Sequence, residues 1–227
     1  MTDQRTAPVP HRRPAPDRRV GPEYTEVRYQ QFRPTPGQRR ALAVAGGLVT
    51  PLAAPLAWLA RRSDLAHRTL AEALSLVPYL PGVVLRSQFY RRALRRCGTN
   101  LLVEFGAVLV QPDVEVGDDV LIGRYTIVHH CDLGDQVLVG ERCTFLSGSR
   151  QHRSTRTDVP MAHQGGLRRR ISVGDDCWIG SHALVMDDVA RGSVVAGGAV
   201  VTRPVAERSV VAGNPARLVR TRTERSS

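Results

Sequence analysis

A period of six residues organises the middle and C-terminal parts of the chain. An aliphatic residue followed by glycine recurs in it, first at Val116 and Ile122 and later at Val173 and Ile179. In a parallel β-helix, each six-residue unit forms one short strand whose aliphatic side chain points into the coil. The pattern therefore predicts a mainly β protein with a parallel β-helix over residues 99–213.

Two further features of the repeat refine this prediction. The residue four positions after each anchor is small or β-branched, as suits the tight corner of a narrow prism. These residues are Val120, Thr126, Val137, Cys143, Cys177 and Ala183. The glycines that follow the anchors are expected where the chain turns and a positive φ is favoured. These glycines are Gly117, Gly123, Gly134, Gly140, Gly174 and Gly180.

The repeat is broken between Phe145 and Val173, which are 28 residues apart. Because 28 is not a multiple of six, a solenoid accommodates the extra residues only as a loop that projects outward. Such loops commonly build the binding face of repeat proteins. We therefore predict an outward loop over residues 146–172 and expect functional residues there. The repeat then resumes up to residue 213, and residues 214–227 are expected to form a C-terminal cap and tail.

The N-terminal part of the chain has a different pattern. Residues 1–40 contain seven prolines and nine arginines with little apolar content, which favours a disordered or extended basic arm. Residues 41–60 carry no charge, but seven of them are alanine, and Pro51 and Pro55 interrupt the stretch. Three alternatives stay open for this stretch: a bilayer-spanning helix, a re-entrant or surface-lying membrane segment, and a helix packed on the protein.

Two more helices are predicted before the repeat, within the helical region 41–98. The first begins with Ser63 or Asp64 as its N-cap. The apolar residues expected near one face of it are Leu65, Leu70, Leu74 and Val77. The second, PGVVLRSQFYRRALRRCG, alternates an apolar face with arginines that include Arg86. A basic amphipathic helix of this kind fits a membrane surface and packing under the β-helix equally well.

The net charge of +11 comes entirely from two N-terminal segments. Residues 1–40 and 61–98 have arginine excesses of five and six, whereas the repeat region is balanced. No nucleic-acid-binding motif accompanies this charge, so we expect no nucleic acid partner and favour an anionic membrane surface for residues 1–98. The four cysteines have no zinc-ligand spacing, and no metal site is expected. Without a secretory signal, the expected location is the cytoplasm, at the inner face of the membrane.

Several segments between about residues 78 and 220 carry a family resemblance: PGVVLRSQFYRRALRRCG, VGDDCWIGSHALV, GSVVAGGAVVTRPV and VVAGNPAR. They resemble the hexapeptide-repeat acyltransferases, in particular the galactoside, maltose and polysaccharide O-acetyltransferases. The resemblance implies a left-handed β-helix, a homotrimer, and acetyl-CoA bound as acyl donor between neighbouring subunits. It also implies that the acceptor and CoA groove is lined by Trp178, Ser181, Gly197 and Thr202. Asn214 would then lie near the nucleotide end of CoA.

The family uses a histidine near the start of the outward loop as general base. By this resemblance the base is His152, although an ungapped alignment places Arg150 there. His163 and His182 are weaker alternatives. The run from Arg168 to Arg170, just before the repeat resumes, is either a site for CoA phosphates or a solvated strand.

The pair His129 and His130 stands where the galactoside-type enzymes carry acidic residues that orient the acceptor. His130 is therefore a candidate to polarise or orient an acceptor hydroxyl. We expect an acetyl-CoA-dependent O-acetyltransferase acting on a sugar hydroxyl in cell-surface polysaccharide or lipid-linked glycan synthesis. One alternative is a non-catalytic trimeric scaffold at the membrane. Another is a carbonic-anhydrase-like metal hydratase, which needs three histidines that converge on zinc.

Overall fold

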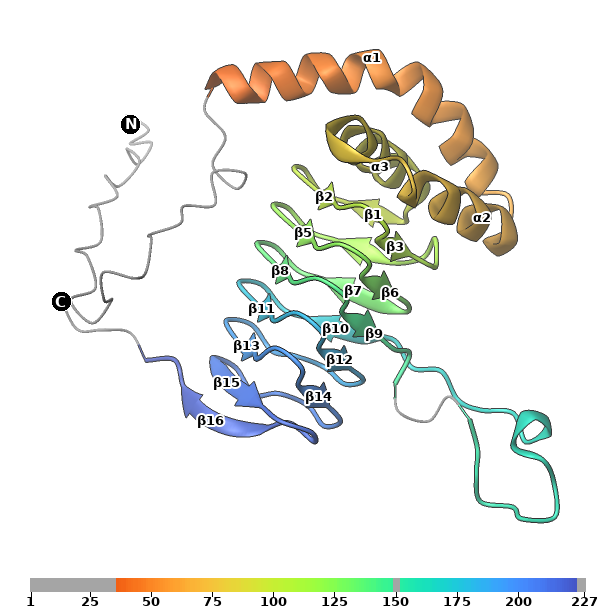
Figure 1. Ribbon diagram of the computed structural model, residues 1–227, viewed down its shortest axis with the longest axis vertical. Helices are drawn as coiled ribbons and strands as arrows, with labels where there is room; N and C mark the ends of the chain where they lie inside the picture. The colour runs from red at the N-terminus through yellow and green to blue at the C-terminus, as the bar shows by residue number, and fades with distance from the viewer. Residues whose placement is uncertain (1–35, 149–151, 224–227) are drawn as a thin grey trace, which may run out of the picture. The chain divides into compact units, whose positions relative to one another are not determined.

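The computed structural model describes residues 36–148 and 152–223, and these form a β-solenoid of about six turns preceded by three helices. Short strands stack on one another in three sheets, so that each sheet forms one face of the solenoid (Figure 1). The chain visits the first, second and third face in turn and then begins the next coil. The repeat that was read as a parallel β-helix is thus confirmed as a solenoid.

The strands of each face pair in parallel with the strands of the neighbouring coils. The first face holds β1 (Arg96–Cys97), β4 (Glu115–Val116), β7 (Cys131–Leu133) and β10 (Ile171–Val173). The second face holds β2 (Leu102–Val103), β5 (Leu121–Ile122), β8 (Leu138–Val139), β11 (Trp178–Ile179), β13 (Val194–Val195) and β15 (Ser209–Ala212). The third face holds β3 (Val108–Leu109), β6 (Ile127–Val128), β9 (Thr144–Phe145), β12 (Leu184–Val185) and β14 (Val200–Val201). The last strand, β16 (Arg217–Thr221), is antiparallel to β15.

The core is a set of stacked ladders formed by the aliphatic anchors. On the second face Ile122 lies beside Val139, and Val139 lies beside Ile179. All three are almost completely buried. The small residues predicted at the corners are buried too, and this confirms their packing role, that of Cys143 and Cys177 included. Because neighbouring coils bury the same column of side chains, each coil depends on its neighbours for its core.

The repeat glycines do not adopt the backbone conformation expected from the sequence. None of the six has a positive φ, and the left-handed positions fall two residues later, for example at Asp119 and Tyr125. A Cβ on Gly123 would instead lie 2.6 Å from the carbonyl carbon of Gly140 in the next coil. The glycines are therefore required because neighbouring backbones approach closely at these turns, and the expectation of positive φ at them is wrong.

Three helices precede the solenoid: α1 (Pro36–Ala60), α2 (Asp64–Ser75) and α3 (Tyr79–Ala93). The helix α1 continues through Pro51 and Pro55 and packs on α2 and α3. The helices α2 and α3 in turn contact strands of the first coil. The bilayer-spanning alternative for residues 41–60 is not met, since no helix in the described part of the chain has the length and apolarity that a membrane crossing needs.

The start of α2 matches its predicted cap, because Ser63 Oγ accepts a hydrogen bond from the Ala66 amide at 3.1 Å. The apolar face was only partly correct. Leu74 is buried, but Leu65 is 76% exposed. Nine residues at 100° per residue place these two leucines on opposite sides of the helix, so Leu65 does not belong to the buried face.

The helix α3 packs under the solenoid, with Phe89 and Tyr90 completely buried. Arg86, expected on its basic face, is also completely buried. Its guanidinium donates to the carbonyls of Val103 at 2.9 Å, Leu74 at 3.0 Å and Val77 at 2.8 Å. Burial lowers the pKa of this group. The prediction for Arg86 is therefore wrong: this cation connects the end of α2 to the first coil instead of facing solvent.

Candidate functional site

The outward loop and the His129–His130 pair occur at the same edge of the solenoid. We call this the loop edge: the described segments that lead from the third face to the first, which are 110–114, 129–130, 146–148 with 152–170, 186–188 and 202–204. Adjacent segments are joined by backbone hydrogen bonds, such as the 2.9 Å bond from the Ile171 amide to the His130 carbonyl. The loop leaves the stack after β9 and returns at β10 (Figure 1). The residues inserted at the break in the repeat thus form a loop that projects outward next to His130.

Three polar residues of the loop edge occupy equivalent positions in successive coils. Asp113, His130 and Arg170 each stand three residues before an anchor of the first face, and those anchors pair through β4, β7 and β10. The His130 Nδ1 atom lies 3.5 Å from Asp113 Oδ1. The Arg170 guanidinium donates to Asp113 Oδ2, and at 2.8 Å to Asp132 Oδ1. The stacked column brings a carboxylate, an imidazole and a guanidinium together.

This arrangement places a carboxylate beside one nitrogen of the His130 imidazole. Asp113 Oδ1 is buried and accepts no hydrogen bond, although it lies within ion-pair distance of His130 Nδ1. A carboxylate next to Nδ1 favours the tautomer that carries its proton there, which leaves the Nε2 lone pair available to a hydroxyl group. For the adjacent His129, burial lowers the pKa, and the neighbouring His130 lowers it further. Both effects favour the neutral form of His129.

His152 is exposed in the first part of the loop. Next to it, the Arg153 amide donates to the Gly165 carbonyl at 2.9 Å and closes the loop on itself. The alternative base His163 is likewise exposed, in the short 3-10 helix η2 (Met161–His163). Arg150, the other alternative, lies outside the described residues. The structure therefore brings His152 to the loop edge as an accessible side chain, as a base for an external hydroxyl requires.

The arginine run at the end of the loop has mainly a structural role. Arg169 forms ion pairs with Asp187 and Asp188, the latter at 2.8 Å. Arg170 is paired with Asp113 and Asp132, as described above. An acid near the site also has a structural partner: Asp132 accepts a hydrogen bond from the Glu115 amide at 2.8 Å. Two of the three arginines proposed for CoA phosphates are thus already paired with carboxylates.

A second edge collects three other residues predicted from the sequence. We call it the glycine edge: segments 123–126, 140–143, 180–183 and 196–199, which lead from the second face to the third, together with the turn 213–216 between β15 and β16. Ser181, Gly197 and Asn214 all lie on it and are all exposed. Backbones approach closely here, since a Cβ on Gly180 would lie 2.4 Å from the Gly197 nitrogen. The Gly198 amide also donates to the Ser181 carbonyl at 2.9 Å.

The last two predicted residues lie on different parts of the solenoid. Trp178 is 55% exposed on the second face, between Leu138 and Val194. Thr202 follows β14 on the loop edge and is half-buried. Within one copy, His130, His152 and Thr202 therefore share one edge, whereas the residues of the glycine edge lie across the third face from them.

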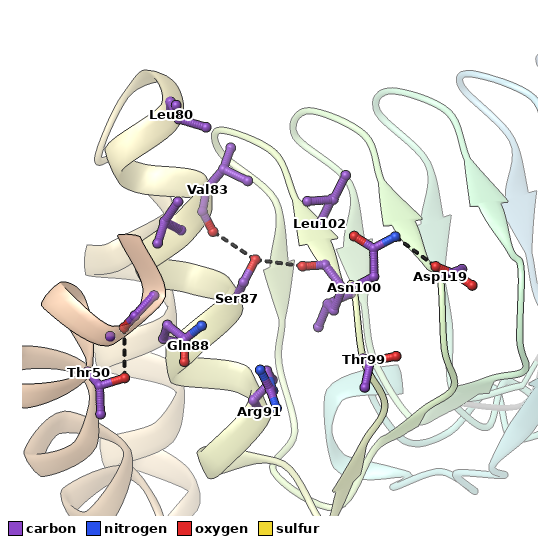
Figure 2. Close-up of a pocket in the computed structure, with 14 residues that line it drawn as sticks. Thr50, Leu80, Val83, Ser87, Gln88, Arg91, Thr99, Asn100, Leu102 and Asp119 are labelled. Atoms are coloured by element: carbon purple, nitrogen blue, oxygen red, sulfur yellow. Dashed lines mark hydrogen bonds between the residues drawn. The ribbon is translucent and has the colours of Figure 1, made fainter. Parts of the chain in front are cut away.

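A cavity of about 560 Å³ lies elsewhere, between α1, α3 and the first coil. Figure 2 shows Ser87 and Arg91 on one side of it and Asn100 with its partner Asp119 on the other. Its lining contains none of the predicted site residues. The described residues also include no group of three His, Cys, Asp or Glu placed to hold a metal ion, so the zinc site that the hydratase alternative requires is not found among them.

Comparisons with known proteins agree with the fold. No family model matches the chain. A protein described as a probable acetyltransferase of Mycobacterium tuberculosis is 30% identical over 111 residues, which are 47% of this chain and 36% of that protein. The galactoside O-acetyltransferase of Escherichia coli is 31% identical over 125 residues, or 49% of this chain and 59% of that protein. The chain thus spans less than two thirds of either curated relative.

The solved structure of a galactoside acetyltransferase in complex with coenzyme A has the same fold. It superposes with a TM-score of 0.59 at 20% identity, and the match covers 70% of this chain and 82% of that one. By its repeat, its β-solenoid and these matches, the chain resembles the hexapeptide-repeat acetyltransferases, in particular the galactoside and maltose O-acetyltransferases.

Proposed function

We propose that the protein is an acetyl-CoA-dependent O-acetyltransferase whose acceptor is a sugar hydroxyl in a cell-surface polysaccharide or lipid-linked glycan. One observation carries the proposal: the outward loop with His152 leaves the solenoid at the edge where His130 Nδ1 lies 3.5 Å from Asp113 Oδ1. Both curated relatives are named acetyltransferases, and the solved galactoside enzyme holds coenzyme A. The basic N-terminal region suits an acceptor that is held near an anionic surface.

In the proposed reaction, His152 is the general base. Its imidazole takes the proton of the acceptor hydroxyl as that oxygen attacks the carbonyl carbon of the thioester. A backbone N–H stabilises the negative charge that develops on the carbonyl oxygen. The carbon–sulfur bond then breaks, and the sulfur leaves as the CoA thiol with the proton carried by His152. The products are an acetyl ester and free CoA, so atoms and charges balance.

His130 is proposed to orient the acceptor. With its Nδ1 side turned to Asp113, the imidazole presents Nε2 as an acceptor for a second hydroxyl of the sugar. The galactoside-type pattern has an acidic residue at this place, so the two groups would contact different hydroxyl arrangements. We therefore expect the acceptor of this protein to differ from that of the galactoside-type enzymes.

The two edges support the proposal of a homotrimer. Ser181, Gly197, Thr202 and Asn214 are proposed to bind CoA, and Trp178 the substrate. Of the four CoA residues, only Thr202 shares an edge with the catalytic histidine. One copy of a rigid solenoid does not bring both edges to a single thioester. A second copy that lays its glycine edge against the loop edge of the first would complete the site, and three copies arranged in this way close a ring.

The function is tested by the release of free thiol from acetyl-CoA in the presence of a panel of sugars, oligosaccharides and lipid-linked glycans. We expect at least one acceptor to raise the rate above acceptor-free hydrolysis, with an acetyl ester detected by mass spectrometry. If no acceptor on a broad panel does so, while acetyl-CoA still binds, the non-catalytic scaffold becomes the better explanation. A longer acyl-CoA in the same assay shows whether acetyl is the preferred group.

The substitution Asp113→Asn is expected to raise the KM for the acceptor by about tenfold, since it removes a charged partner from His130. The KM for acetyl-CoA should change much less, because three of the four proposed CoA residues, Ser181, Gly197 and Asn214, lie on the glycine edge. Asp158→Asn is the matched control, as Asp158 is also paired with an arginine, Arg156, but within the outward loop. Equal effects of the two substitutions on the acceptor KM would contradict a positioning role for Asp113.

A further inference from the structure

The helix α1 has an inverted distribution of apolar side chains. The residues of α1 that are almost fully covered are small, among them Ala53, Ala57 and Ala60, and Val49 and Leu56 are partly buried against the core. Five large apolar side chains of α1 are exposed instead: Val44, Leu48, Leu52, Trp58 and Leu59. A helix on the surface of a soluble protein normally turns its leucines toward the core and polar residues toward water. The exposed side of α1 therefore resembles a surface that contacts another apolar medium.

The exposed residues form one continuous stripe. At 100° per residue, Val44, Leu48, Leu52 and Leu59 fall within a sector of about 80°, opposite the buried alanines. The stripe is about 22 Å long at 1.5 Å rise per residue. On its other side α1 packs against α2 and α3, which separate it from the coils (Figure 1). The stripe therefore lies beyond the helices at the N-terminal end of the stack.

Positive charge borders this stripe at both ends. Residues 36–60 include no Asp or Glu, whereas Arg40 near the start and Arg61 and Arg62 after the end are exposed. The Arg62 guanidinium lies 4.0 Å above the ring of Trp58. Tryptophan and arginine side chains of this kind suit the boundary between an apolar layer and charged groups, because each has an apolar body and a polar end.

We propose that the outer stripe of α1 lies in the interfacial layer of an anionic lipid surface, with the leucines among the acyl chains and the arginines at the phosphates. A second copy of α1 is a poorer occupant. Antiparallel pairing would place Arg40 against Arg61 and Arg62, and parallel pairing would place each arginine against itself, so both arrangements repel. The inference goes beyond the proposed function, because it holds whatever the acceptor is.

The test is sedimentation of the full chain with vesicles of phosphatidylcholine alone and of phosphatidylcholine with phosphatidylglycerol. The double variant Leu48→Gln/Leu52→Gln should bind the anionic vesicles at least about tenfold more weakly than wild type, because two leucines lose their apolar burial. The matched control is Leu218→Gln/Val219→Gln, which changes two apolar residues of β16 that are exposed to a similar degree. This control should bind within about twofold of wild type.

Two further measurements distinguish the lipid surface from other occupants. Arg61→Gln/Arg62→Gln should reduce the preference for anionic over neutral vesicles. In a Trp178→Phe background, the emission of Trp58 should shift to shorter wavelength when vesicles are added. Unchanged vesicle binding by the double leucine variant would overturn the proposal. So would loss of a protein oligomer in that variant without any loss of lipid binding.

Vesicle binding is measured without acetyl-CoA, so its result is independent of the acyl-transfer assay. A thermal unfolding curve for each variant shows whether the fold is retained. Because the changed side chains are exposed, the curves should coincide with that of wild type.

Discussion

Replacing His152 with alanine is expected to lower kcat for acetyl transfer by roughly 10²- to 10⁴-fold, the usual contribution of a general base. The acceptor hydroxyl then has no group to take its proton as it attacks the thioester. His152 is exposed and lies in a loop, so the substitution should leave the stability of the solenoid unchanged. The measurement is thiol release at saturating acetyl-CoA with the best acceptor from the panel.

His163→Ala is the matched control, because it removes another exposed histidine of the same loop. Its kcat should stay within about twofold of wild type. His130→Ala is expected to raise the acceptor KM more than it lowers kcat, as befits a residue that orients the substrate. The assignment of the base would be refuted by a His152→Ala enzyme with wild-type kcat. If His152→Ala kept wild-type kcat and His130→Ala lost turnover, we would assign His130 as the general base instead.

The substitution Arg86→Met is expected to lower the free energy of unfolding by about 3 kcal/mol. Arg86 is completely buried, and its guanidinium satisfies the carbonyls of Leu74, Val77 and Val103. Methionine fills a similar volume but donates nothing, so these acceptors would be buried without partners. The loss of the buried charge offsets part of that cost, which keeps the expected effect at a few kcal/mol.

Denaturant unfolding followed by circular dichroism measures this difference. Arg91→Met is the control on the same helix, since Arg91 is exposed, and it should change the free energy by no more than about 0.5 kcal/mol. The loss of unfolding free energy in Arg86→Lys should lie between those of Arg86→Met and Arg91→Met, because an ammonium group reaches fewer of the three carbonyls. Equal stability of the Met variants at positions 86 and 91 would show that these hydrogen bonds contribute nothing net.

The solenoid itself could be predicted because its signal is local and repeated. Anchors such as Ile122 and Ile179 recur at six-residue spacing, and neighbouring coils bury them against one another. The same repetition made the break after Phe145 visible. The function of the glycines was harder to see. Pattern alone cannot distinguish a turn that needs positive φ from one where two backbones approach closely, and Gly123 belongs to the second kind.

The column at the loop edge was missed, although the sequence holds a signal for it. Asp113, His130 and Arg170 each precede a first-face anchor by three residues. Counting from the anchors instead of along the chain would have placed the three in one column. The length of the inserted loop hides this relation, since 40 residues separate His130 from Arg170 but only 17 separate Asp113 from His130.

The sequence by itself determined the period, the position of the outward loop and the resemblance that names His152, because these depend on residue type and spacing. Only the tertiary structure decided which side chains meet. It buried Arg86 among carbonyls, turned the leucines of α1 outward, set Asp113 beside His130, and separated the loop edge from the glycine edge. The physical reason is that burial and pairing depend on contacts between coils and helices that are far apart in the chain.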